Sequence, residues 1–144
     1  MKLNEQDKEL IQLATKVASA NADIYPKPSM TVGCVLKAKS GKVYKGVNIY
    51  TSHSICAEQV AFGQALANGE REFDTIVAVK MNDDNTSNVI TPCGVCRYLF
   101  DKFGVDINVI VNDPKNNKTL KVKAEELLPY AFKRDVKYIN KTKK

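Results

Sequence analysis

Two short stretches, each at the start of a predicted helix, hold three of the four cysteines of this chain. Cys93 and Cys96 lie three residues apart in "TPCGVCRYLF", so their side chains fall on one face of a helix that begins there. Cys56 stands just before a run of small and apolar residues that predicts a packed helix. A fold that joins these two helix starts gathers three thiols around one point. This requirement restricts the arrangement of the chain more than any other feature.

The spacing of Cys93 and Cys96, taken alone, allows more than one interpretation. A helix N-terminus favours thiolate over thiol because its N–H groups carry partial positive charge. Two such thiolates suit zinc, with Zn–S distances of about 2.3 Å, but a redox pair or two packing residues fit the same spacing. Adding Cys56 favours zinc, because three protein ligands leave one position of a tetrahedral ion open, as in catalytic sites.

Glu58 follows Cys56 by two residues, within the first turn of the same predicted helix. A carboxylate in an apolar helix is costly to bury without a partner, so its presence requires a reason. We expect Glu58 to face water at the open zinc position and to pass a proton from that water to a substrate. A carboxylate that carries protons must not itself be a ligand, and the one-residue gap after Cys56 allows that separation.

The rest of the chain alternates between predicted helices and strands. Apolar residues at helical spacing predict an amphipathic helix over 3–21, with Asn4 as its N-cap and Asp7 three residues on. Predicted strands cover 30–38 and 42–50, which form a hairpin, then 73–81, 105–113 and, at an edge, 116–124, with further helices at 94–104 and 124–132. This order predicts an α/β sandwich with a largely buried sheet, in one domain of residues 1–144.

Composition limits the compartment and the partners. Hydrophobic residues make up 44% and charged residues 26%, which is ordinary for a globular protein. We find no apolar run near the length of a membrane span and no signal-peptide core, so we expect a cytoplasmic protein without membrane contact. In a reducing compartment, four cysteines favour metal or catalysis over disulfides. Much of the net charge of +6 lies in 133–144, which we interpret as a solvated basic tail rather than a nucleic-acid surface.

The motifs "CAE" and "PCGVC" together resemble the zinc-dependent cytidine deaminase family in its three-cysteine, homotetrameric form. The segments "YPKPSMTVGC", "GVNIY" and "ELLPYAF" are similar to further motifs of that family, so the likeness extends over residues 4–132. The stretch "NGEREFDTIVAVK" resembles the blasticidin S deaminase branch. The resemblance implies a three-layer α/β/α sandwich with a mixed, mostly five-stranded sheet, and a role in pyrimidine salvage.

The resemblance also implies a reaction. One Zn²⁺ per subunit would be bound by Cys56, Cys93 and Cys96, and Glu58 would be the general acid/base. The reaction would convert a 4-aminopyrimidine, cytidine or deoxycytidine, to the 4-oxo product with release of ammonia. The residues implied in substrate binding are Asn48, Tyr50, Ala57, Met30, Thr91 and Phe132.

Among these, the Ala57 N–H and the Thr91 carbonyl would meet the pyrimidine ring. Phe132 matches an aromatic residue that family members send into the site of a neighbouring subunit. This match implies a homotetramer with shared active sites.

The chain departs from the family pattern at several positions. Gln59 replaces the arginine that commonly follows the glutamate, which leaves Arg97 as the candidate to hydrogen-bond a ligand sulfur, unless it is a solvated or interface residue. Asn48 is kept, but Tyr50 replaces a glutamate that helps to hold the ribose, and Met30 replaces a ring-stacking phenylalanine. The substrate therefore stays open between cytidine or deoxycytidine and a cytosine-nucleoside antibiotic of the blasticidin S type.

Two other classes of function remain as alternatives. Cys34 is interpreted as a small buried residue, but as a fourth ligand it would close the zinc site and make the chain a non-catalytic, zinc-stabilised binding module. His53, the only histidine, is interpreted as a surface-loop residue. A nucleic-acid-editing deaminase is disfavoured, because the "LLPYAF" segment indicates subunits that close the pocket over a small substrate.

Overall fold

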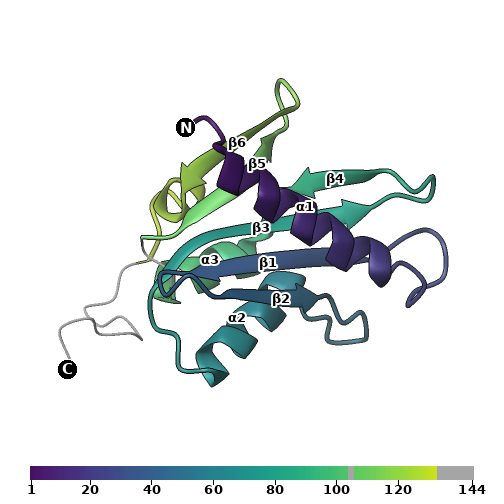
Figure 1. The fold of residues 1–144 in the computed structure, drawn as a ribbon, viewed down its shortest axis with the longest axis horizontal. Coiled ribbons are helices and arrows are strands. Elements are labelled where there is room, and N and C mark those ends of the chain that lie inside the picture. Colours follow the sequence, from purple (N-terminus) through teal and green to yellow (C-terminus); the bar gives the residue numbers. More distant parts are fainter. Residues whose placement is uncertain (104–105, 133–144) are drawn as a thin grey trace.

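The structure of the protein is a computed structural model that describes residues 1–103 and 106–132; the predicted basic tail, 133–144, lies outside these residues. In the described part, three α-helices, six strands and one 3₁₀-helix form the fold (Figure 1). The helices are α1 (Glu5–Ala20), α2 (Ala57–Ala67), α3 (Gly94–Phe103) and the 3₁₀-helix η1 (Ala124–Leu127). The strands are β1 (Val32–Ala38), β2 (Val43–Val47), β3 (Phe73–Met81), β4 (Ser87–Ile90), β5 (Asn108–Asp113) and β6 (Lys118–Lys123).

All six strands form one mixed sheet, and β3 is at its centre. The strand order is β2-β1-β3-β5-β6, and β4 pairs only with β3. Along one side of β3 runs the antiparallel strand β1. On the other side, residues 75–77 pair with the parallel strand β5, and residues 78–81 pair with the antiparallel strand β4. Two strands therefore share one side of β3, and they meet at its middle.

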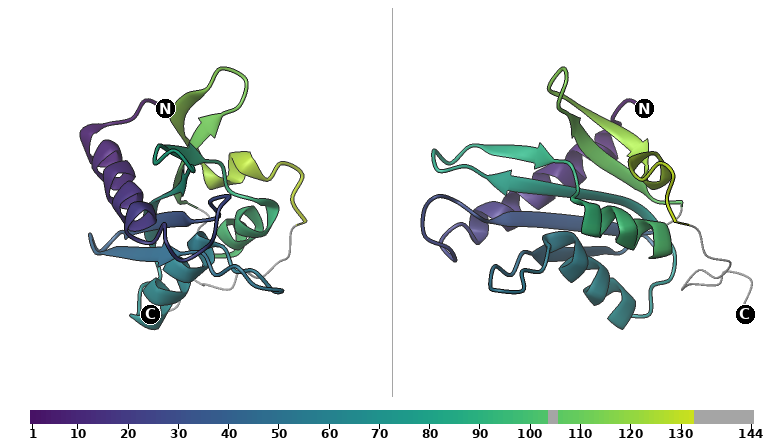
Figure 2. Two further views of the ribbon diagram at one scale, coloured as in Figure 1. Left: turned by 90° about the vertical axis from the view of Figure 1, so that its right-hand side faces the viewer. Right: turned by 180° about the vertical axis from the view of Figure 1, so that it is seen from behind.

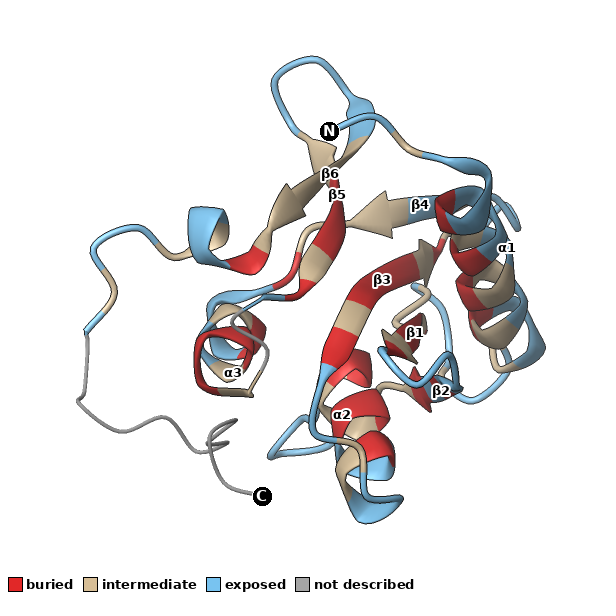
Figure 3. Ribbon diagram, turned by 60° about the vertical axis from the view of Figure 1, so that its left-hand side comes forward, coloured by how far each residue is buried: buried red, intermediate tan, exposed pale blue. Residues whose placement is uncertain are grey.

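The sheet is the middle layer of three, with α1 on one face and α2 and α3 on the other (Figures 1 and 2). Successive side chains of a strand point to opposite faces, so Val35 packs in the cluster with α1, whereas Leu36 packs in the cluster with α2 and α3. On that second face, Phe62 of α2 contacts Phe100 of α3, with 5.8 Å between ring centroids. Figure 3 shows β3 buried along most of its length. The expected α/β/α sandwich is confirmed.

Glycines allow both helical layers to approach the hairpin of β1 and β2. A Cβ on Gly33 would lie 2.5 Å from the Ala18 nitrogen, because α1 crosses the sheet there. A Cβ on Gly46 would overlap the Ala57 carbonyl and lie 2.7 Å from the Ala61 nitrogen of α2. Gly46 therefore sets the close contact between the hairpin and the first turn of α2, where Cys56 and Glu58 lie.

The first helix begins as predicted. The Asn4 side chain accepts a hydrogen bond from the Asp7 backbone N–H (2.8 Å), and the Asp7 carboxylate accepts one from the Asn4 backbone N–H (2.9 Å). Asp7 also pairs with Lys121 of β6 at 2.8 Å, with 4% of the Asp7 side chain exposed. This ion pair joins the start of α1 to the far edge of the sheet.

Two elements differ from the expectation. The predicted helix over 124–132 is limited to one 3₁₀ turn, Ala124–Leu127, because Pro129 disfavours helical geometry at the residue before it. The strand β4 was not predicted, since four residues with two polar side chains carry no clear alternation. No helix in the described ranges is long and apolar enough to cross a membrane.

Candidate metal centre and active site

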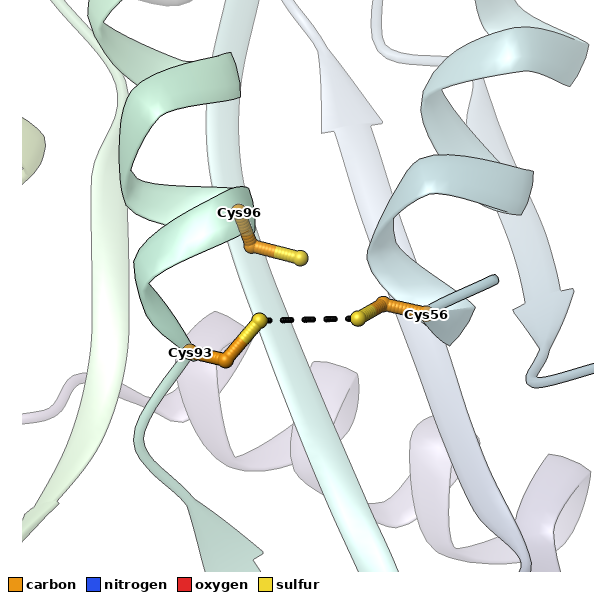
Figure 4. A group of neighbouring side chains, drawn as sticks. All are labelled: Cys56, Cys93 and Cys96. Atoms are coloured by element: carbon orange, nitrogen blue, oxygen red, sulfur yellow. Dashed lines mark hydrogen bonds between the residues drawn. The ribbon is translucent and has the colours of Figure 1, made fainter. Parts of the chain in front are cut away.

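Two helix starts converge on the same face of the sheet and bring three cysteines together. Cys56 is the N-cap of α2, Cys93 immediately precedes α3, and Cys96 lies in the first turn of α3. Their sulfur atoms all lie within 4.8 Å of one another, and the Sγ atoms of Cys56 and Cys93 are 3.5 Å apart. Figure 4 shows the three side chains pointing toward a common centre. The predicted convergence is confirmed.

The unpredicted strand β4 explains how Cys93 reaches this centre. Because β4 runs antiparallel along residues 78–81 of β3, it brings the chain from the end of β3 back to its middle, where Thr91 follows. The Thr91 hydroxyl donates a hydrogen bond to the Asn112 carbonyl at the end of β5 (2.9 Å). This bond fixes the residues that precede Cys93, so the cysteine pair is held by two strands as well as by its helix.

The three thiols differ in their readiness to ionise. Burial raises the pKa of Cys93, but hydrogen bonds from the backbone N–H groups of Cys96 and Val95 and from the neighbouring thiols outweigh it, and the pKa is lowered. Burial, and then the hydrogen bond with Cys93, raise the pKa of Cys56 to about 11. Burial and the charge of Glu58 raise the pKa of Cys96. Without a cation, Cys56 and Cys96 therefore hold their protons more firmly than a free thiol, whereas Cys93 is the most readily ionised of the three.

These properties fit a zinc ion. Zinc with four tetrahedral ligands and Zn–S bonds of about 2.3 Å spaces its sulfurs about 3.8 Å apart, which lies within the range seen in the cluster. All four cysteines are free thiols, so no disulfide competes for them. Mutual repulsion among three sulfur anions is relieved by a divalent cation at their centre. The donor set thus suits a soft metal site with three protein ligands.

Glu58 lies beside this cluster but is not part of it. Its side chain is in the first turn of α2, and 5% of the residue is exposed. Burial raises the pKa of Glu58, opposed by hydrogen bonds from its own backbone N–H and from the Cys96 thiol. A buried carboxyl group with a raised pKa can both accept and return a proton near neutral pH.

A cavity of about 200 Å³ opens beside the cluster and the carboxylate. Ten residues line it: Val32, Asn48, Ser54, Ile55, Cys56, Ala57, Glu58, Ile90, Thr91 and Cys93. Three of the predicted substrate-binding residues, Asn48, Ala57 and Thr91, are thus in its wall. The other three, Met30, Tyr50 and Phe132, are not among the lining residues, and 54% of Tyr50 and 72% of Phe132 are exposed.

Comparison with known proteins supports what this geometry indicates. Residues 4–112 match the sequence model of the cytidine and deoxycytidylate deaminase zinc-binding region. The chain belongs to this deaminase family. It is 34% identical over 140 residues to a blasticidin-S deaminase of Bacillus cereus, covering 92% of this chain and 96% of that one. It is 33% identical over 124 residues to a probable cytidine deaminase of Dictyostelium discoideum, covering 82% and 81%.

A solved structure gives the same assignment for the fold of this deaminase. The crystal structure of cytidine deaminase from Burkholderia pseudomallei superposes with a TM-score of 0.64 at 29% identity, covering 84% of this chain and 98% of that one. The zinc-binding region of the family and the three-sulfur cluster together identify one zinc ion per subunit as the cofactor.

Two residues beside the cysteines of this deaminase make contacts with the backbone. The Gln59 side chain accepts a hydrogen bond from the Cys56 N–H (3.0 Å), so it helps to cap the N-terminus of α2. Arg97 donates from Nε to the Pro92 carbonyl (2.8 Å) and from a terminal nitrogen to the Leu127 carbonyl (3.2 Å). Arg97 thereby joins the start of α3 to η1, and its proposed contact with a ligand sulfur is not among these bonds.

The remaining candidates lie apart from the sulfur cluster of the deaminase. Cys34 is fully buried in β1, and burial, followed by the charge of Glu58, raises its pKa. Among the described residues the metal-ligating group consists of the other three cysteines, so Cys34 is not a fourth member. His53 is exposed on the loop before α2, where its ring lies 3.3 Å from the Ser52 hydroxyl.

Tyr25 was missed by the sequence analysis. It precedes β1, and its hydroxyl donates a hydrogen bond to the Asn48 carbonyl (2.6 Å) and accepts one from the Tyr50 N–H (2.9 Å). Tyr25 begins the segment "YPKPSMTVGC", but the segment does not reveal its role, because its partners are backbone atoms more than twenty residues away.

Proposed function

We propose that the protein is a hydrolytic deaminase that converts the 4-amino group of cytidine or deoxycytidine to a 4-oxo group and releases ammonia. The observation that carries the proposal is the buried carboxylate of Glu58 beside three convergent thiols, at the wall of a cavity. Cys56, Cys93 and Cys96 would hold the zinc ion, which when bound would lower the pKa of a coordinated water molecule toward neutrality.

In the proposed reaction, water adds to C4 and ammonia leaves, so protons must move from water to the substrate. Glu58 takes a proton from the attacking water and delivers it to ring N3, then moves a second proton to the departing amine. The Ala57 N–H and the Thr91 carbonyl orient the ring, because each is fixed before charge develops. The bond from Thr91 to Asn112 supports this, since it holds that backbone in place.

The decisive experiment replaces Glu58 with glutamine. Loss of the 4-amino chromophore is followed with cytidine, deoxycytidine, cytosine and blasticidin S, and zinc is measured by mass spectrometry. We expect Glu58→Gln to lower kcat by about 10²- to 10⁴-fold while the protein keeps one zinc ion per subunit. Glu72→Gln, which changes an exposed carboxylate before β3, serves as the control with normal activity. Normal turnover by Glu58→Gln would exclude the proposed mechanism.

Blasticidin S is the second candidate substrate. It is favoured by the 34% identity to a blasticidin-S deaminase over nearly the whole of both chains. It is also favoured by Tyr50, which replaces the carboxylate that would grip a ribose hydroxyl. The same four-compound panel separates the two candidates, since kcat/KM will be highest for the physiological class of substrate.

The proposed assembly is a homotetramer with shared sites. Apolar residues of the loop before α2 and of the first turn of α3 are exposed in the single chain, with 45% of Ile49, 40% of Ile55 and 59% of Val95 accessible. Phe132, the residue that matches the shared aromatic of the family, is 72% exposed. Contact with neighbouring subunits would cover these apolar side chains.

Subunit mixing tests the shared site. If Phe132 completes the site of a neighbour, Phe132→Ala and Glu58→Gln will each have low activity, but mixed oligomers will regain part of it, because an intact Glu58 site then receives an intact Phe132. Mixing that restores nothing, with oligomers shown to exchange subunits, would reject the shared site.

A cytoplasmic location is proposed on chemical grounds. The zinc site needs reduced thiols, and all four cysteines are free. Reducing compartments keep thiols in that state.

A further inference from the structure

We propose that Tyr25 is a positioning residue of this active site: its hydroxyl fixes the backbone of residues 48–50, and with it Asn48, which lines one wall of the cavity. The inference rests on the proposed function for its kinetic consequence, although the hydrogen-bonding contacts themselves are independent of it. Tyr25 lies on the connection between α1 and β1, far in sequence from the wall that it holds.

The regular pairing of β1 with β2 ends just before this wall. The last paired residues are Gly33 and Val47. Beyond them, the Asn48 N–H donates to the Val32 carbonyl (3.2 Å). The Asn48 side chain then makes two further hydrogen bonds to the backbone before β1 and at its start. Its Oδ1 accepts from the Val32 N–H (2.9 Å), and its Nδ2 donates to the Met30 carbonyl (2.8 Å). One amide hydrogen of Asn48 remains for a ligand in the cavity.

The Tyr25 hydroxyl binds the next backbone groups along the chain after the Asn48 N–H. It donates to the Asn48 carbonyl (2.6 Å) and accepts from the Tyr50 N–H (2.9 Å), so one oxygen serves two backbone groups in sequence. The Tyr25 and Tyr50 rings also meet edge to face, with centroids 6.0 Å apart. The backbone on both sides of Ile49 is thus held by a single side chain.

The two hydrogen bonds of the Tyr25 hydroxyl, here called the tether, also affect the other end of the loop, which leads into Cys56. Ile49 and Ile55 exchange two backbone hydrogen bonds, of 2.9 and 2.8 Å. Ile55 lines the cavity and immediately precedes Cys56. Holding Ile49 in place therefore holds both arms, and with them Asn48 and Ile55 in the cavity wall.

Removal of the hydroxyl leaves the Asn48 carbonyl and the Tyr50 N–H without this partner. The loop then spends less time in the arrangement that binds substrate. If the binding-competent fraction falls to about a tenth, KM rises about tenfold. Glu58 and the three zinc-binding cysteines lie in, or directly before, the first turns of α2 and α3, which Tyr25 does not contact, so we expect kcat and zinc content to stay unchanged.

The experiment compares Tyr25→Phe with Tyr44→Phe in the zinc-loaded full-length protein. Tyr44 is the matched control, because its hydroxyl makes an equally short bond (2.6 Å to Glu70) from the strand that leads into Asn48, away from the cavity lining. Hydrogen exchange of the Tyr50 amide is measured by NMR, and kcat and KM are measured for the panel substrate that is turned over. We expect Tyr25→Phe to speed exchange of the Tyr50 amide and raise KM about tenfold, with kcat within about twofold. Tyr44→Phe should change neither.

Unchanged exchange of the Tyr50 amide in Tyr25→Phe would overturn the tether, as would an equal change in Tyr44→Phe. Faster exchange with an unchanged KM would overturn its role in binding. If the wild-type protein turns over no panel compound, the proposed function fails, and the exchange of the Tyr50 amide still decides whether the tether exists.

Discussion

At the scale of single residues, close packing can require glycine at a position as strictly as chemistry requires a functional side chain. Gly46 has no room for a Cβ, because the first turn of α2 packs on it. We predict that Gly46→Ala lowers the free energy of unfolding by about 1–3 kcal/mol through overpacking. It will also weaken zinc binding, since the displaced turn begins at Cys56. Urea denaturation and a zinc competition assay measure the two effects.

Gly63→Ala is the matched control in α2. A Cβ at Gly63 meets nothing within 4 Å, so the change should instead stabilise the helix by about 1 kcal/mol. If both alanine variants behave alike, the close contact at Gly46 does not control stability.

The role of Cys34 distinguishes a catalytic zinc site with three cysteine ligands from a closed, structural site with four. It is fully buried in the core of the sheet and is not a member of the sulfur cluster. Cys34→Ala should therefore keep a full complement of zinc and lower the free energy of unfolding by only about 1 kcal/mol. Cys56→Ser should lose most of the bound zinc. Zinc loss from Cys34→Ala, measured on the dialysed protein, would favour the four-sulfur alternative.

The sequence predicts the cysteines and Glu58 because they are placed by helix starts, and helix starts have local signals. It does not predict Tyr25 or the cap made by Gln59. Gln59 stands three residues after the N-cap, as in a capping box, but Cys56 is not one of the usual N-cap residues, so the sequence does not indicate this cap. For Tyr25, only the fold brings the partners together.

At the scale of elements, α1 depends on its anchor to β6. Asp7 and Lys121 form an ion pair with 4% and 13% of their side chains exposed. We predict that Asp7→Ala lowers the free energy of unfolding by about 3 kcal/mol, because it leaves a largely buried charge unpaired and breaks the capping box. The measurement is urea denaturation followed by circular dichroism.

Glu5→Ala is the comparison for that change. Glu5 pairs with Lys8 on the same helix, but 86% of its side chain is exposed, so removal should cost less than about 0.5 kcal/mol. Equal losses in the two variants would mean that helix charge, rather than the anchor to β6, accounts for the effect.

Predicted elements with strong apolar patterns match the structure, and weakly patterned ones do not. The strand over 73–81 has the predicted bounds, since a β-branched run between polar ends allows little else. The strand β4 forms instead because β5 pairs only with residues 75–77 of β3, so residues 78–81 can pair with another strand on that side. A neighbour in space supplies the reason for that strand, so its own residues could not reveal it.

At the scale of the whole molecule, much of the core packing does not depend on a bound metal ion. The face of the sheet that holds α2 and α3 contains an apolar cluster, and Phe62 contacts both Phe73 (4.7 Å) and Phe100 (5.8 Å) within it. This packing joins α2 to the sheet and to α3 without the cysteines. The metal-free chain should therefore stay folded, in contrast to small domains that need zinc to fold.

Removal of zinc should consequently lower Tm without loss of helical circular dichroism at room temperature. A ligand that binds only the folded chain raises its stability by an amount that grows with affinity. The pKa of Cys56 is raised to about 11 by burial, and that of Cys96 is also raised, so zinc must displace protons from both at neutral pH. Affinity therefore increases with pH, and the Tm difference between zinc-loaded and chelated protein should widen from pH 6 to pH 8. Calorimetry with and without chelator measures it. A difference that stays constant from pH 6 to pH 8 would mean that the thiols are already ionised before the metal binds.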